Sequence, residues 1–203
     1  MQNTVSFKTA LINFIRTNAQ PPDKFSHQSR LYPLAVSLAG EQPFDDDVVF
    51  AGAWIHDLGV FVGHRPEDPA ALASWDYLGY VLRVAPTILE ACGFPAAKVP
   101  AVLEVIRTHT PDSIPRSFEA TLVHDADILE QLGAIGILRT VSKVGRDTRF
   151  IRFSDAIRVL QKNATELERL IKLDSARTLA IPRLKTLRCF FEACEMEAGG
   201  VEW

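Results

Sequence analysis

The histidines are the residues of this chain best suited to chemistry, and one of them is followed directly by an aspartate. His56 and Asp57 stand at the end of an apolar segment, residues 53–59, with the sequence AWIHDLG. An imidazole and a carboxylate at the buried end of a helix cost desolvation free energy unless both are paired or bound. A divalent cation removes that cost and uses both groups, whereas an isolated His-Asp pair is more often a helix cap.

Two further groups of polar residues flank this pair. His27 stands near the start of a predicted helix, with Arg30 three residues later. Residues 123–136, VHDADILEQLGAIG, place Asp125 and Asp127 in an otherwise apolar helix. A His, a His-Asp pair and a later Asp on three different helices supply two nitrogens and two oxygens, a suitable set for a borderline divalent metal.

The order His27, His56-Asp57, Asp127 resembles the ligand order of the HD-domain superfamily of metal-dependent phosphohydrolases, which has an all-α fold. The run from Asp125 to Gly136 resembles the Asp-Ala-Asp…Gly-Ala-Ile-Gly signature of a small stand-alone branch of that superfamily. The tail containing Thr178-Leu-Ala and Arg183 resembles the same branch, so the likeness extends over about residues 22–200. A His-Asp pair alone is a weak signal, but four ligands in order with this run are a strong one.

The resemblance implies that His27, His56, Asp57 and Asp127 hold one divalent metal ion. Its identity stays open among Mn, Fe, Co, Ni, Zn and Mg, because imidazole and carboxylate ligands accept several metals. Asp125 lies about 200° from Asp127 around a helix, so the two are not expected to reach the same ion. Asp125 is therefore expected either to position its helix or to orient a ligating side chain, and the exchange of the two assignments stays open.

The resemblance also places further residues around a phosphate. His109, at the end of an apolar helix, is expected to donate a hydrogen bond or act as a general acid, the alternative being a histidine that interacts with the helix dipole. Arg30 could grip a phosphate with two hydrogen bonds or pair with an acidic neighbour. His64 and Arg65, on the loop after the His-Asp pair, are candidate substrate contacts.

His124 and Arg183 are expected to be structural, Arg183 through an ion pair within the bundle. Enzymes of the superfamily with two metals usually carry an additional His pair between the His-Asp motif and the last Asp. In this interval only His109 stands out beside the loop residue His64, so a mononuclear site is expected.

The implied activity is metal-dependent hydrolysis of a phosphate ester or anhydride of a nucleotide or other small phosphorylated metabolite. The metal would activate a water molecule, and Asp57 could help accept its proton as a catalytic residue beside His109. Two alternatives stay open. One is an HD-type hydratase acting on a small nitrile-like substrate, and the other is a non-catalytic regulator that senses a metal or a nucleotide.

The elements that position these residues are predicted to be helices, because apolar residues recur at helical spacing almost throughout. A first helix contains Val5, Phe7, Leu11, Phe14 and Ile15. The other helices are expected over residues 26–40, 45–59, 70–84, 86–92, 96–108, 118–132, 135–143, 154–173 and 175–198, with a short strand piece possible only near 149–153. The fold class is therefore an all-α, single-domain multi-helix bundle over residues 1–203, with a metal-site core at about 22–145 and helices at about 154–198 packed on it.

Composition agrees with a soluble, single-domain protein. The chain has 203 residues, 47% of them hydrophobic, with 22 Lys and Arg against 25 Asp and Glu, a net charge of −3. No strongly positive field favours duplex nucleic acid or an anionic membrane as partner. Three cysteines without a CxxC pair argue against a disulfide framework. Neither a signal peptide nor a membrane-spanning segment is expected, so the cytoplasm is the predicted location. Homodimerisation stays open because of Trp203 and the apolar C-terminal helices.

Overall fold

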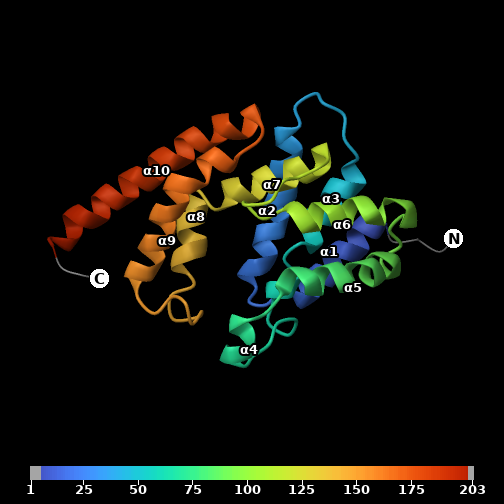
Figure 1. Cartoon of the computed structure of the whole chain (residues 1–203), viewed down its shortest axis with the longest axis horizontal. Helices are drawn as coiled ribbons and strands as arrows, with labels where there is room; N and C mark the ends of the chain where they lie inside the picture. Colours follow the sequence, from blue (N-terminus) through green and yellow to red (C-terminus); the bar gives the residue numbers. More distant parts are fainter. Residues whose placement is uncertain (1–5, 201–203) are drawn as a thin grey trace. The chain divides into compact units, whose positions relative to one another are not determined.

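The computed structural model describes residues 6–200, and these residues are helical with short connecting loops (Figure 1). Within this range no strand forms, and the only β-type pairing is an isolated bridge between Val62 and Arg65. The α-helices are α1 (Phe7–Asn18), α2 (Asp23–Leu38), α3 (Asp46–Ile55), α4 (Pro69–Ala73), α5 (Tyr77–Ala91), α6 (Val99–Thr108), α7 (Phe118–Glu130), α8 (Gly133–Val141), α9 (Phe153–Glu166) and α10 (Asp174–Ala198), with 3-10 turns at Leu58–Val60, Ala96–Lys98 and Glu168–Leu170. The all-α prediction is confirmed. Val5 and Trp203 lie outside the described residues.

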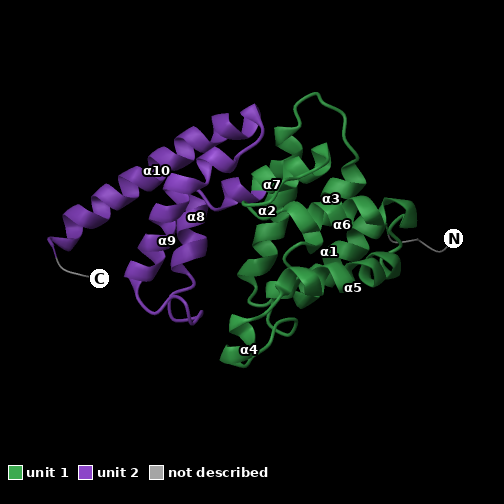
Figure 2. Cartoon of the chain, in the orientation of Figure 1, with its two compact units in different colours: residues 1–126 green, residues 127–203 purple. Residues whose placement is uncertain are grey.

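The chain divides into two compact units, one up to Ala126 and one from Asp127 onward, so that the boundary falls inside α7 (Figure 2). The predicted single domain over 1–203, with the C-terminal helices packed on the metal-site core, stays a prediction. Among the described helices, none is long and apolar enough to cross a membrane.

In the first unit, α3 is the central helix. Its residues from Val48 to Ile55 are all buried, and it packs against α1, α2, α5 and α6. A helix that is apolar on every side is stable only inside a core. It begins at Asp46, close to the predicted start at residue 45, because the Asp45 side chain accepts from the backbone N–H of Asp47 at 3.1 Å and of Val48 at 3.4 Å. It ends at Ile55 rather than at the predicted residue 59. The apolar sequence of α3 therefore carries its C-terminal end, and with it His56, into the interior.

The crossing of α3 and α6 depends on a glycine. A Cβ atom added at Gly52 would lie 2.4 Å from Cγ1 of Val105 on α6. We expect Gly52→Ala to lower the free energy of unfolding by about 1–3 kcal/mol through overpacking, measured by urea denaturation. Adding Val105→Ala, which removes the opposing methyl groups, should restore part of the loss. If the changes in unfolding free energy of the two single variants simply added up in the double variant, the new methyl group at position 52 would not be in contact with Val105.

In the second unit, α10 packs against both α8 and α9, and α8 packs against α9. The inward side of α10 is made of small and aliphatic residues that are buried, namely Ala176, Ala180, Leu184 and Leu187. Their spacing of three and four residues forms one apolar stripe along the helix.

Three sequence predictions need correction. Residues 70–84 and 86–92 form a short α4 and one continuous α5 with Pro86 inside it, because the buried stripe of Val81, Ala85 and Leu89 holds the helix together across the proline. The predicted helix over 154–173 ends at Glu166 and continues only as a 3-10 turn. No strand forms near 149–153, where the backbone turns into the N-terminus of α9.

The second helix also differs from its prediction. It begins at Asp23 rather than near residue 26, and Pro33 lies in its interior. Leu31, Ala35 and Leu38 are buried on either side of that proline, and this packing supports the helix despite the missing N–H.

Candidate metal centre

His56 caps the C-terminal end of α3 and is fully buried. Its Nδ1 lies 3.0 Å from the carbonyl oxygen of Ala53 in the preceding turn. Because a carbonyl only accepts, Nδ1 must carry the proton, and the Nε2 atom of the neutral ring then presents a lone pair. Backbone anchoring of one imidazole nitrogen is the usual way in which the other is oriented toward a metal.

His27 reaches the same place from α2, which packs directly on α3. The His27 and His56 rings meet edge to face with centroids 5.4 Å apart. Nε2 of His27 lies 3.8 Å from one carboxylate oxygen of Asp57, and Nε2 of His56 lies 3.7 Å from the other. Two buried imidazoles thus face one carboxylate whose side chain is 16% exposed.

This donor set fits a divalent cation. One ligand atom from each of His27, His56 and Asp57 can be chosen so that all lie within 4.8 Å of one another. Metal–nitrogen and metal–oxygen bonds of about 2.0–2.2 Å place neighbouring ligand atoms roughly 3–3.5 Å apart. The 3.7 and 3.8 Å separations exceed hydrogen-bond lengths and approach this value. Three of the four predicted ligands therefore lie together.

Asp127, the fourth predicted ligand, lies in the last turn of α7 and belongs to the second unit. Its residue is 8% exposed. Nε2 of Gln131 donates to its Oδ2 at 3.2 Å, and Nη1 of Arg139 lies 4.0 Å from its Oδ1. Its ligation of the metal stays a prediction.

His109 lies next to the candidate ligand His56, at the C-terminal end of α6. It is 3% exposed, and its ring centroid is 4.8 Å from that of His56. Nδ1 lies 2.7 Å from the carbonyl oxygen of Ile106, so this nitrogen also carries a proton. Tyr77, which was not among the predicted site residues, packs with its ring centroid 6.3 Å from that of His109. No local pattern marks Tyr77, because only the approach of α5 to α6 brings it there.

The predicted substrate contacts are less uniform. His64 has both ring nitrogens engaged, Nδ1 with the Tyr80 hydroxyl at 2.8 Å and Nε2 with Oδ1 of Asn18 at 2.9 Å. Burial lowers the pKa of His64 below its usual value. These two hydrogen bonds link the loop to α1 and α5, which favours a structural role for His64. Arg30, one turn along α2 from His27, and Arg65 are both half-buried, and their contact with substrate stays a prediction.

His124 and Asp125 form a separate, fully buried pair. Nδ1 of His124 lies 2.8 Å from Oδ1 of Asp125, and both side chains have no exposed surface. Nε2 of His124 faces the carbonyl oxygen of Pro111 at 3.2 Å. His124 is outside the predicted ligand set, so the role of Asp125 and its exchange with Asp127 as ligand stay open. Arg183, also expected to be structural, donates to the carbonyl oxygen of Leu129.

Solved structures of similar proteins share this arrangement of helices. The crystal structure of Bacillus subtilis YpgQ in complex with ADP matches 96% of this chain and 96% of its own, with 21% identity and a TM-score of 0.73. An HD-superfamily hydrolase from Bacillus thuringiensis matches 96% of this chain and 97% of its own, with 20% identity and a TM-score of 0.68. A predicted HD-superfamily hydrolase from an uncultured Thermotogales bacterium matches 92% and 90%, with 22% identity and a TM-score of 0.62.

No protein-family model and no curated protein matches the sequence. At identities near 20%, the structural likeness shows the fold, and the chain has the fold of the HD-superfamily hydrolases. The predicted fold type is thereby confirmed.

Proposed function

We propose that the chain is a metal-dependent phosphohydrolase that acts on a phosphate ester or anhydride of a nucleotide or other small phosphorylated compound. The observation that carries this proposal is the convergence of His27, His56 and Asp57 at a buried site. The HD-hydrolase fold supports it. The ADP in the YpgQ complex supports a nucleotide as the substrate class.

His27, His56 and Asp57 would hold one divalent ion, with Asp127 proposed as the fourth ligand. When bound, such an ion lowers the pKa of a water molecule and polarises a phosphoryl oxygen. Both histidines are almost completely shielded from solvent. Burial restricts the motion of both rings, and each would bind the ion through the lone pair of a neutral imidazole nitrogen.

Asp57 and His109 would move the protons. The side chain of Asp57 is 16% exposed, so its carboxylate is accessible to water and would accept a proton from the attacking water molecule. In His109 the Nδ1 proton is committed to Ile106, so the exchangeable position is Nε2. A proton held there would be donated to the phosphate or the leaving group. Arg30 is proposed to bind the phosphate, and the cytoplasm is the proposed location.

A hydrolysis panel tests the proposed function. Nucleoside mono-, di- and triphosphates and simple phosphomonoesters are incubated with the protein and Mn²⁺, or with chelator, while phosphate and pyrophosphate are read separately. We expect release with at least one substrate, abolished by chelator and restored by added Mn²⁺. A protein that binds the metal but cleaves nothing in the panel would contradict hydrolysis and favour the hydratase or the sensor.

A further inference from the structure

The Gly-Ala-Ile-Gly run after the proposed ligand Asp127 has a structural explanation. Gly133 has a φ of +68°, and a Cβ there would lie 3.0 Å from Cβ of Arg183 on α10. A Cβ at Gly136 would lie 2.3 Å from the carbonyl oxygen of Gln131. Gly133 therefore lets α10 approach the start of α8, and Gly136 lets the first turn of α8 lie close to the backbone that follows α7.

Two arginines lie at the end of α7. Nη1 of Arg139, on α8, donates to the carbonyl oxygen of Glu130 at 3.2 Å. Arg183, on α10, donates to the carbonyl oxygen of Leu129. The last carbonyls of a helix lack intrahelical partners and carry partial negative charge, so cations are favourable there. Asp127 stands in this same last turn.

Arg139 also faces two carboxylates. Its Nη1 lies 3.8 Å from Oε2 of Glu130, whose side chain is 3% exposed, and 4.0 Å from Oδ1 of Asp127. The other oxygen of Asp127, Oδ2, accepts from Gln131 at 3.2 Å. Each oxygen of the Asp127 carboxylate therefore has its own polar neighbour on the chain. Gln131 lies directly after α7, and Arg139 lies on α8, whose first turn contains both glycines.

We propose that Arg139 is a positioning residue for metal binding, which orients the Asp127 carboxylate while anchored on Glu130. This inference rests on the proposed function, because it takes Asp127 as a ligand. Groups that orient a metal ligand from behind typically change metal affinity about 10- to 100-fold when removed. Arg139 contacts no metal in this role and acts only through Asp127.

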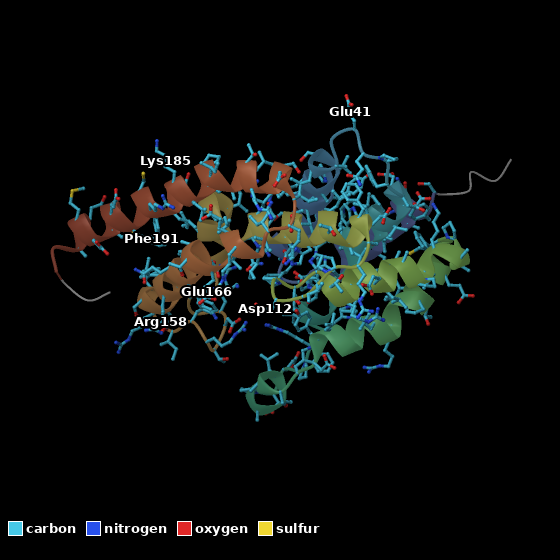
Figure 3. All side chains as sticks on the ribbon, turned by 45° about the horizontal axis from the view of Figure 1, so that its top comes forward. Glu41, Asp112, Arg158, Glu166, Lys185 and Phe191 are labelled. Carbon is cyan, nitrogen blue, oxygen red and sulfur yellow. The ribbon has the colours of Figure 1, made fainter. Side chains whose placement is uncertain are left out.

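The test measures Mn²⁺ affinity of the full-length protein by calorimetry, with no substrate present. We expect Arg139→Met to raise the Mn²⁺ Kd about 10- to 100-fold. The matched control is Arg158→Met, which removes an arginine of α9 whose side chain is 75% exposed and paired with Asp155 (Figure 3). This control should leave the Kd unchanged within twofold.

A double-mutant comparison separates positioning from general damage. In an Asp127→Asn background, Arg139→Met should weaken Mn²⁺ binding no further, because its route to the metal is already altered. Arg139→Lys keeps a cation for Glu130 but lacks the planar fork, so an intermediate Kd is expected. Circular dichroism melting of each variant shows whether it is folded at the temperature of the titration.

Three results would overturn the proposal. They are an unchanged Kd in Arg139→Met, a tighter Kd, which would mean that the guanidinium competes with the metal, and an equal loss in the Asp127→Asn background. If the unsubstituted protein binds no Mn²⁺, the proposed function itself fails. If it binds Mn²⁺ and Asp127→Asn weakens binding while Arg139→Met does not, only the positioning role fails.

Discussion

Asp57→Ala is expected to abolish both metal retention and hydrolysis. The carboxylate of Asp57 is the group toward which the Nε2 atoms of His27 and His56 both point, at 3.8 and 3.7 Å. Without it, two buried imidazoles face each other with no anion between them. Metal affinity should fall by more than the roughly 100-fold that loss of an outer supporting contact costs. Metal content after dialysis and steady-state turnover measure the two effects.

Two further variants sharpen this prediction. Asp57→Asn keeps the size of the side chain and one oxygen but removes the charge, so it should also lose most of its metal affinity. Asp112→Ala removes an exposed carboxylate from a loop and serves as the matched control (Figure 3). Full activity with metal retained in Asp57→Ala would refute the site assignment.

His124→Ala is expected to have the largest effect on stability. His124 and Asp125 are joined at 2.8 Å with no exposed surface on either side chain. Removing the imidazole deletes its buried hydrogen bonds with Asp125 and with the carbonyl oxygen of Pro111 and leaves a cavity, which costs about 2–5 kcal/mol. The free energy of unfolding from urea denaturation at neutral pH measures this loss.

An exposed pair provides the comparison. Arg158→Ala removes the ion pair with Asp155 from a side chain that is 75% exposed, and its cost should stay below about 1 kcal/mol. The contrast between the two variants isolates burial as the cause. A loss below 1 kcal/mol for His124→Ala would show that the buried pair does not stabilise the fold.

The parts of the fold that could be predicted are those in which a local pattern and the core agree. The helix over Asp46–Ile55 is apolar throughout and begins at an acidic cap, so both its start and its burial follow from its residues. The prediction of a short strand near 149–153 was wrong. Ile151 and Phe153 favour β-structure, but they are 77% and 54% exposed, and the described residues contain no strand that could pair with them. Propensity without a partner does not make a sheet.

The part of the candidate site that could be predicted is the part whose residues follow a recognisable order in the sequence. His27, His56 and Asp57 were found because a His and a later His-Asp pair match a known ligand order, and the structure brings them together. Tyr77 could not be found, because only tertiary packing places it against His109. The partners of His64 come from α1 and α5, so its engagement by Asn18 and Tyr80 was equally invisible in the sequence.

Reconstitution with metal tests the central claim most directly. Protein stripped by chelator is titrated with Mn²⁺ while hydrolysis of the best substrate from the panel is followed. We predict no turnover at zero metal and a rise that levels off at one equivalent per chain, in keeping with a single site formed by His27, His56, Asp57 and the proposed ligand Asp127. Turnover that persists in the fully stripped protein, or metal binding that never produces turnover, would contradict the account.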